Sequence, residues 1–126
     1  MKYFICRHCG NIAEKAYDAG VKLVCCGEAM EELIPNSTEA ATEKHYPVAE
    51  RTGSTISVKA SDVAHPMAPE HWIQFIALET QKGYQRVSLK PGDAPEAVFP
   101  LAEGDKAIAA YEHCNLHGLW KTELDK

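Results

Sequence analysis

Cysteine and histidine are the residues of this chain whose types and spacing could do chemistry. Of the 126 residues, five are cysteines and six are histidines. Four of the thiols lie near the start, in Cys6-x-x-Cys9 and in the adjacent pair Cys25-Cys26, and a glycine follows each pair. Glycine lets the backbone turn sharply behind the second thiol of a pair. Four converging thiolates form a soft tetrahedral cage, so this stretch predicts an iron or zinc site.

The adjacency of Cys25 and Cys26 adds a geometric requirement. Side chains of neighbouring residues on an extended strand point to opposite faces, so both thiols reach one ion only if the chain turns there. The alternative is a pair of disulfides, which needs an oxidising compartment. Residues 1–5 lack the long apolar core of a secretory signal peptide. We therefore favour a metal over disulfides and expect a cytoplasmic protein.

The fifth cysteine and four of the histidines form a second candidate set: His45, His65, His71, Cys114 and His117. Each is weak evidence by itself, because a single histidine is more often a surface or hydrogen-bonded residue than a ligand. Two prolines between His65 and His71 exclude a regular helix and stiffen that loop, as a ligand loop requires. Four imidazoles and one thiolate leave one position of a six-coordinate ion open, which is typical of a catalytic metal. Iron, copper and zinc all suit these ligands.

The two remaining histidines are not predicted to be ligands. His8 lies inside the first cysteine pair and is expected to be exposed to solvent. His113 directly precedes Cys114, so on a strand its side chain points to the opposite face.

Composition and charge limit the function classes. Hydrophobic residues make up 45% of the chain and charged residues 25%, as in an ordinary soluble globular protein. The net charge is −5 and no stretch is rich in lysine or arginine, which argues against a nucleic-acid partner. No apolar run is long enough to span a membrane.

Short apolar runs separated by turn signals predict an all-β chain. We expect strands at residues 3–5, 22–24, 32–34, 55–59, 72–79, 84–89, 96–99, 106–111 and 119–123. Residues 1–35 are too few to bury a self-sufficient core, so a metal is expected to organise this first domain. Residues 36–42 are polar and rich in turn formers, which indicates a linker. Residues 43–126 are predicted to form an antiparallel β-sandwich.

Taken together, the motifs resemble the two-iron desulfoferrodoxins, a family of superoxide reductases. The resemblance covers the whole chain and rests on Cys6-Arg7-His8-Cys9-Gly10, Cys25-Cys26-Gly27, Glu43-Lys44-His45, His65-Pro66-Met67, Glu70-His71-Trp72 and Cys114-Asn115-Leu116-His117-Gly118-Leu119-Trp120. Every expected ligand position is occupied. The visible departure is Tyr46, where a smaller β-branched residue is expected, and it affects no ligand.

The resemblance implies two iron ions per chain. It implies a desulforedoxin- or rubredoxin-like first domain with a closed four-cysteine iron. It also implies an immunoglobulin-like sandwich whose ferrous iron has four equatorial histidines and Cys114 as axial thiolate. Glu43 is implied as a carboxylate that can take the sixth position in the oxidised state, and Lys44 as the positive charge beside the open face.

The activity implied by the resemblance is one-electron reduction of superoxide to hydrogen peroxide, without oxygen evolution, in defence against oxidative stress. Rubredoxin or a similar small carrier is implied as the electron donor, and the chain as a homodimer. Three alternatives predict different observations. A superoxide dismutase would evolve oxygen, and a non-catalytic two-centre electron carrier would tolerate the loss of Lys44 or Glu43. A zinc-stabilised interaction module would be colourless after aerobic purification.

Overall fold

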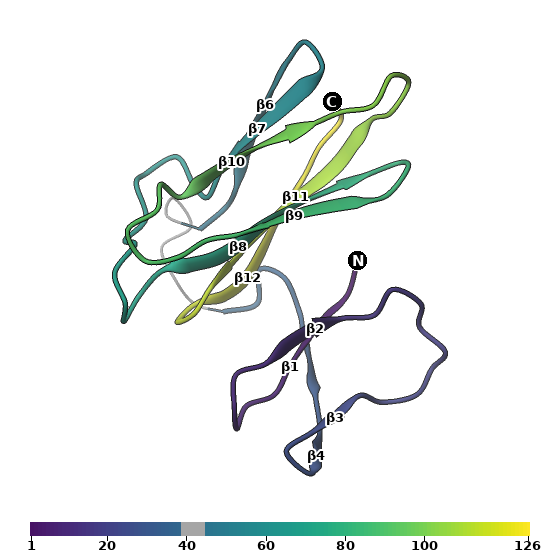
Figure 1. The fold of residues 1–126 in the computed structure, drawn as a ribbon, viewed down its shortest axis with the longest axis vertical. Helices are drawn as coiled ribbons and strands as arrows, with labels where there is room; N and C mark the ends of the chain where they lie inside the picture. Colours follow the sequence, from purple (N-terminus) through teal and green to yellow (C-terminus); the bar gives the residue numbers. More distant parts are fainter. Residues whose placement is uncertain (39–44) are drawn as a thin grey trace. The chain divides into compact units, whose positions relative to one another are not determined.

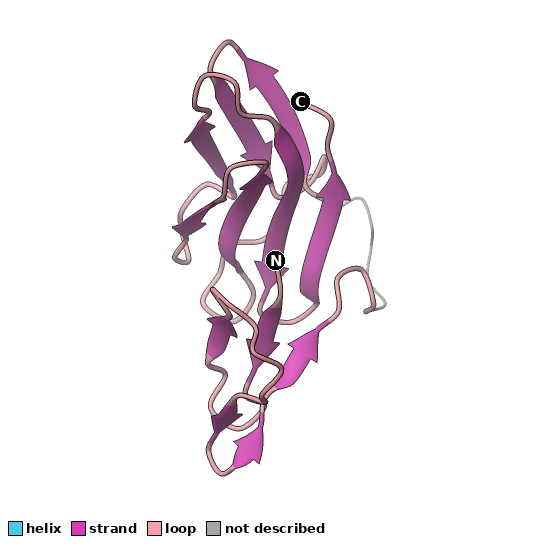
Figure 2. Ribbon diagram, turned by 90° about the vertical axis from the view of Figure 1, so that its right-hand side faces the viewer, coloured by secondary structure: helices cyan, strands magenta, loops and turns pink. Residues whose placement is uncertain are grey.

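The regular structure of this chain is built from β-strands throughout the part that the structure describes (Figure 2). The computed structural model describes residues 1–38 and 45–126. These residues divide into two compact units, Met1–Ile34 and Pro35–Lys126. The predicted all-β class is confirmed. Across the described ranges, no helix has the length and apolar character needed to cross a membrane.

The first unit contains two small antiparallel sheets (Figure 1). One has the order β2-β1-β5, from strands Ile12–Glu14, Tyr3–Ile5 and Glu31–Leu33, and the other pairs β3, Val24–Cys25, with β4, Glu28–Ala29. Its buried hydrophobic residues are few, namely Tyr3, Cys6 and Leu33. So small an apolar core is typical of domains that need a metal or a disulfide to fold.

The second unit is a sandwich of a three-stranded and a four-stranded sheet. The first has the order β10-β7-β6, from strands Glu96–Pro100, Thr55–Lys59 and Val48–Thr52. The second has the order β12-β11-β8-β9, from strands Gly118–Glu123, Ala107–Cys114, Ile73–Thr80 and Tyr84–Ser88. Neighbouring strands are antiparallel in both sheets. The predicted antiparallel sandwich is therefore confirmed.

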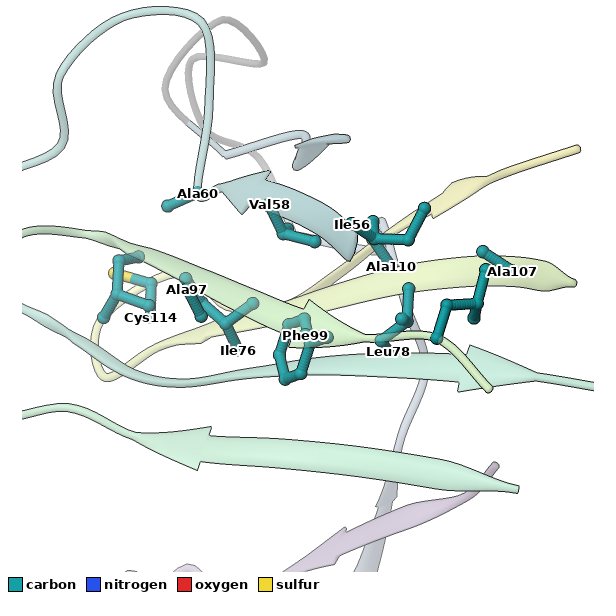
Figure 3. Packing of buried hydrophobic residues seen from close by; sticks show 12 residues of the cluster. Ile56, Val58, Ala60, Ile76, Leu78, Ala97, Phe99, Ala107, Ala110 and Cys114 are labelled. Carbon is teal, nitrogen blue, oxygen red and sulfur yellow. The ribbon is translucent and has the colours of Figure 1, made fainter. Parts of the chain in front are cut away.

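Alternating side chains of the strands fill the space between the two sheets (Figure 3). Ile56 and Val58 of β7 are fully buried, and the core extends along β11 as far as Cys114. Burying one such aliphatic side chain contributes roughly 1.5–3 kcal/mol. Cys114 therefore lies at one end of a packed core, which holds its sulfur in place.

Most predicted strands are present, and the differences have physical reasons. The run at residues 106–111 is a strand that continues to Cys114 as β11. Of residues 22–24, only Val24 is in a strand. Sequence reasoning missed β2, β4 and β6; β6 is mostly exposed and lies at a sheet edge, so it lacks the apolar alternation that marks a buried strand.

Candidate metal centres

The structure brings the four N-terminal thiols together. Their sulfur atoms, from Cys6, Cys9, Cys25 and Cys26, all lie within 4.8 Å of one another. Cys9 Sγ is 3.6 Å from Cys25 Sγ, far beyond a disulfide bond and close to the ~3.8 Å edge of a tetrahedron with metal–sulfur bonds of about 2.3 Å. All five cysteines of the chain are free. The cluster thus fits a four-thiolate metal and not a pair of disulfides.

Backbone turns allow the adjacent cysteines to face one site. Cys26 has φ +53°, in the left-handed region, and Gly27 follows with φ +76°. The turn predicted at this pair is therefore present. At the first pair, Gly10 has φ +83° and its N–H donates to the carbonyl of Cys6 at 2.8 Å.

Hydrogen bonds give the thiols of this cluster different pKa values. The backbone N–H of Cys9 is the main cause that lowers the pKa of Cys6 to about 6. Hydrogen bonds to Cys6 and to the other thiols raise the pKa of Cys26 to about 12. A metal ion must therefore displace protons from the set when it binds, and its affinity depends on pH.

The second candidate set forms one cluster in the other unit. The ligand atoms of His45, His65, His71, Cys114 and His117 lie within 4.8 Å of one another. The four imidazoles form a closed ring in the order His45, His65, His71, His117. Neighbouring ring centroids are 5.0, 4.7, 5.1 and 4.7 Å apart, and neighbouring planes meet at 78° to 87°. This cyclic arrangement suits four nitrogen ligands around one ion.

Three parts of the fold supply these residues. His65 and His71 lie in the connection between β7 and β8, where the backbones of Ala68 and His71 exchange two hydrogen bonds of 2.9 and 3.0 Å. Cys114 is the last residue of β11, and His117 lies in the turn to β12. His45 precedes β6.

Individual ring nitrogens are oriented for binding. His65 Nδ1 lies 2.6 Å from the carbonyl oxygen of Pro66, which leaves Nε2 for the cluster. That Nε2 is buried and has no hydrogen-bond partner among the described residues. His117 instead presents Nδ1, 3.0 Å from His45 Nε2 and 3.8 Å from Cys114 Sγ. A buried imidazole nitrogen without a hydrogen bond, beside other ligand atoms, fits a metal ion.

Burial shifts the pKa values of His65 and Cys114 in this cluster. It lowers the pKa of His65 to about 4, so that imidazole is neutral near pH 7, as a metal ligand must be. Burial also raises the pKa of Cys114, while the backbone N–H groups of Leu116 and His117 oppose the shift. A cation at the centre of the ring would supply the charge that stabilises a buried thiolate.

Comparison with known proteins agrees with this geometry. Residues 37–123 match the desulfoferrodoxin family. A desulfoferrodoxin from Syntrophotalea carbinolica is 46% identical, over 98% of this chain and 96% of its own length. The chain belongs to the desulfoferrodoxin family.

Solved structures are similar to this chain over different spans. The superoxide reductase from Treponema pallidum is 38% identical with a TM-score of 0.82, covering 97% of this chain and 98% of that chain. The superoxide reductase (1Fe-SOR) from Giardia intestinalis is 28% identical with a TM-score of 0.58. It matches 67% of this chain over 99% of its own.

The other residues singled out from the sequence are placed as follows. Glu43 and Lys44 lie outside the described residues. His8 is exposed, with Nε2 3.2 Å from a carboxylate oxygen of Glu28. His113 is buried on β11, where Nδ1 lies 2.7 Å from Gln74 Oε1 and the ring stacks on Phe75. Among the described residues, the two clusters of candidate ligand atoms include neither His8 nor His113.

Sequence reasoning missed three residues next to the five-ligand cluster. Glu112, two residues before Cys114 on β11, is fully buried, and burial raises its pKa well above the ordinary value. Trp120 packs on His45, and Asn115 connects two ligand loops. Glu112 had a sequence signal, as a carboxylate directly after an apolar run, and Asn115 and Trp120 lay within the quoted family motif. The contacts of Trp120 and Asn115 appear only once the strands are assembled.

Proposed function

We propose that the five-ligand cluster holds iron and reduces superoxide by one electron to hydrogen peroxide, without evolving oxygen. The chain is a superoxide reductase by family, and its similarity to the Treponema pallidum enzyme covers both units. The observation that carries the site assignment is the closed ring of four imidazoles with the buried sulfur of Cys114 within 4.8 Å of their ligand nitrogens. The family implies iron at both candidate sites.

The reaction joins one superoxide, one electron and two protons into hydrogen peroxide. Bound ferrous iron would supply the electron, and a thiolate ligand would favour its release by pushing electron density toward the metal. The chain's part is to hold four imidazoles and the thiolate in fixed positions. The neutral state of His65 keeps its nitrogen available as a ligand, and the core packing around Cys114 keeps water from the sulfur.

Lys44 and Glu43 complete the proposal as catalytic residues. A lysine beside the open position would attract the superoxide anion and organise proton delivery to the product. Glu43 would close the vacant position after oxidation. Their support is the family motif Glu43-Lys44-His45 together with the location of His45 in the imidazole ring.

The four-cysteine cluster is proposed to hold a second iron that passes or stores electrons. Its four thiolates fill a tetrahedral site, so no position is left for an oxygen species. The Giardia intestinalis enzyme supports this division, because a superoxide reductase of that length covers only 67% of this chain. The proposed domains are residues 1–35 for this iron, 36–42 as the connection and 43–126 for catalysis.

The partners and location are proposed from the family resemblance. Rubredoxin or a similar small carrier would return the electron to the catalytic iron, and the chain would act as a cytoplasmic homodimer. The absence of basic clusters supports a protein without a nucleic-acid partner.

The deciding experiment combines metal analysis with a visible spectrum before and after superoxide is added. We expect iron at both sites and a new absorption band on oxidation that is lost in Cys114→Ser. An oxygen electrode run in parallel separates reduction from dismutation, because only dismutation evolves oxygen. Colourless protein with zinc at both sites would overturn the proposal. Unchanged kinetics in Lys44→Ala and Glu43→Ala would remove those residues from the catalytic role.

A further inference from the structure

Asn115 lies between two ligands of the second cluster and binds the loop that carries a third. It directly follows Cys114 at the end of β11 and precedes the turn that holds His117. Its side-chain Oδ1 accepts a hydrogen bond from the backbone N–H of Trp72 at 2.9 Å. Its Nδ2 donates to the backbone carbonyl of Glu70 at 3.1 Å.

The two partners of this amide flank His71 in sequence. One side chain therefore binds the residue before this histidine and the residue after it, with a donor on one side and an acceptor on the other. The backbone N–H of Asn115 adds a third bond, to the carbonyl of Trp72 at 3.2 Å. These bonds continue the pairing of β11 with β8 beyond the last ladder pair, Cys114 with Ile73.

Regular strand pairing does not explain this arrangement. The register between β11 and β8 shifts between His113 and Cys114, so the ladder is irregular at the thiol that ends it. Beyond Cys114, the three hydrogen bonds of Asn115 connect the loop that carries His71 to the loop that carries Cys114 and His117. An amide suits the position because it supplies one acceptor and one donor to a pair of backbone groups.

We propose that Asn115 is a positioning residue that holds His71 in register with Cys114 and His117. Its side-chain hydrogen bonds go to backbone groups of the loop that carries His71. By fixing the distance between one imidazole of the ring and the thiolate, it would set how strongly the sulfur interacts with the metal. Residues that orient metal ligands commonly change metal affinity about 10- to 100-fold when they are removed. The inference rests on the proposed function in one respect only: the effect of Asn115 on superoxide turnover requires that the chain has that activity.

The test uses the full iron-loaded chain and three variants. Asn115→Ala removes both side-chain bonds, and Asn115→Asp keeps the acceptor for Trp72 N–H while losing the donor to Glu70. Val98→Ala is the control, because Val98 is 62% exposed on β10 and belongs to neither ligand loop. The measurements are the energy of the thiolate-to-iron absorption band in the oxidised protein, the reduction potential, and the rate of iron release to a chelator.

We expect Asn115→Ala to shift the band and to release iron about tenfold faster or more. Asn115→Asp should lie between Asn115→Ala and the wild type, and Val98→Ala should match the wild type. A wild-type band, potential and release rate in folded Asn115→Ala would overturn the proposal. If that variant does not fold, a wild-type band and release rate in Asn115→Asp would overturn it instead. Should the wild type fail to reduce superoxide while these shifts appear, the proposed function fails and the role of Asn115 stands.

Discussion

The indole Nε1–H of Trp120 donates a hydrogen bond to the backbone carbonyl oxygen of His117 at 3.1 Å. The same indole ring lies 5.2 Å from the ring of His45, with the planes tilted by 30°. Trp120 is 2% exposed and lies on β12. One buried side chain therefore supports two neighbouring members of the imidazole ring, His45 by packing and His117 through its backbone.

Replacing Trp120 with phenylalanine should loosen His117 while keeping an aromatic ring beside His45. The lost hydrogen bond contributes about 1 kcal/mol, and its carbonyl acceptor would be left without this donor. We expect a lower free energy of unfolding and weaker iron binding at the histidine site. Urea unfolding and chelator competition measure the two effects. If Trp120→Phe retains iron as well as the wild type does, the packing on His45 alone is sufficient to support the site.

Tyr46 is the residue that departs from the expected family pattern, and its ring lies edge-to-face on Trp120. The centroids are 5.0 Å apart at 75°, and the tyrosine is 38% exposed. An aromatic pair of this kind is worth about 0.5–1.5 kcal/mol. We expect Tyr46→Val to lower the free energy of unfolding by about that amount and Tyr46→Phe to leave it nearly unchanged. Equal stability of the valine variant and the wild type in urea would contradict this account.

Glu112 is buried near Cys114 of the five-ligand cluster, and both of its carboxyl oxygens lack a hydrogen-bond partner among the described residues. Burying such a group costs free energy, so Glu112→Met, which keeps a similar volume, should stabilise the metal-free chain by about 1–3 kcal/mol. Burial raises the pKa of Glu112, so the folded state holds a proton that the unfolded state releases. The penalty therefore grows as the pH rises above the ordinary glutamate pKa.

The advantage of Glu112→Met should accordingly be larger at pH 8 than at pH 4. Thermal or urea unfolding of chelator-treated protein at the two pH values measures it. Glu96→Met is a suitable control, because Glu96 is exposed on β10. An advantage that shrinks as the pH rises would show that the carboxyl group has a stabilising partner in solution.

Cys9→Ser tests the division of labour between the two clusters. Cys9 contributes a sulfur to the four-thiol group and none to the five-ligand group. We expect the visible band of the N-terminal iron to be damaged while the fast reaction with superoxide remains. Pulse radiolysis or stopped-flow mixing measures that rate. Complete loss of the reaction in a correctly folded Cys9→Ser protein would mean that the N-terminal iron takes part in the chemical step.

The sequence predicted the strands with the clearest patterns and the membership of both clusters. β7 at Thr55–Lys59 follows from strict alternation, and the turn at Cys26 follows from two adjacent thiols having to face one ion. Weakly patterned strands such as β6 were missed. Their pairing depends on a neighbouring strand and not on their own apolar residues.

Residue types and local spacing were sufficient to determine the ligand chemistry of this protein: four thiols in two pairs, and a separate set of histidines with one cysteine. Ligand identity is a local property, because it depends on which donor atom a side chain carries. Only the tertiary structure decided that the imidazoles close into a ring in the order His45, His65, His71, His117 and that Asn115 and Trp120 hold them. Apart from the hydrogen bond between Trp120 and His117, which are three residues apart, those relationships join residues far apart in the chain. They arise when the two sheets pack and the ends of β8, β11 and β12 meet.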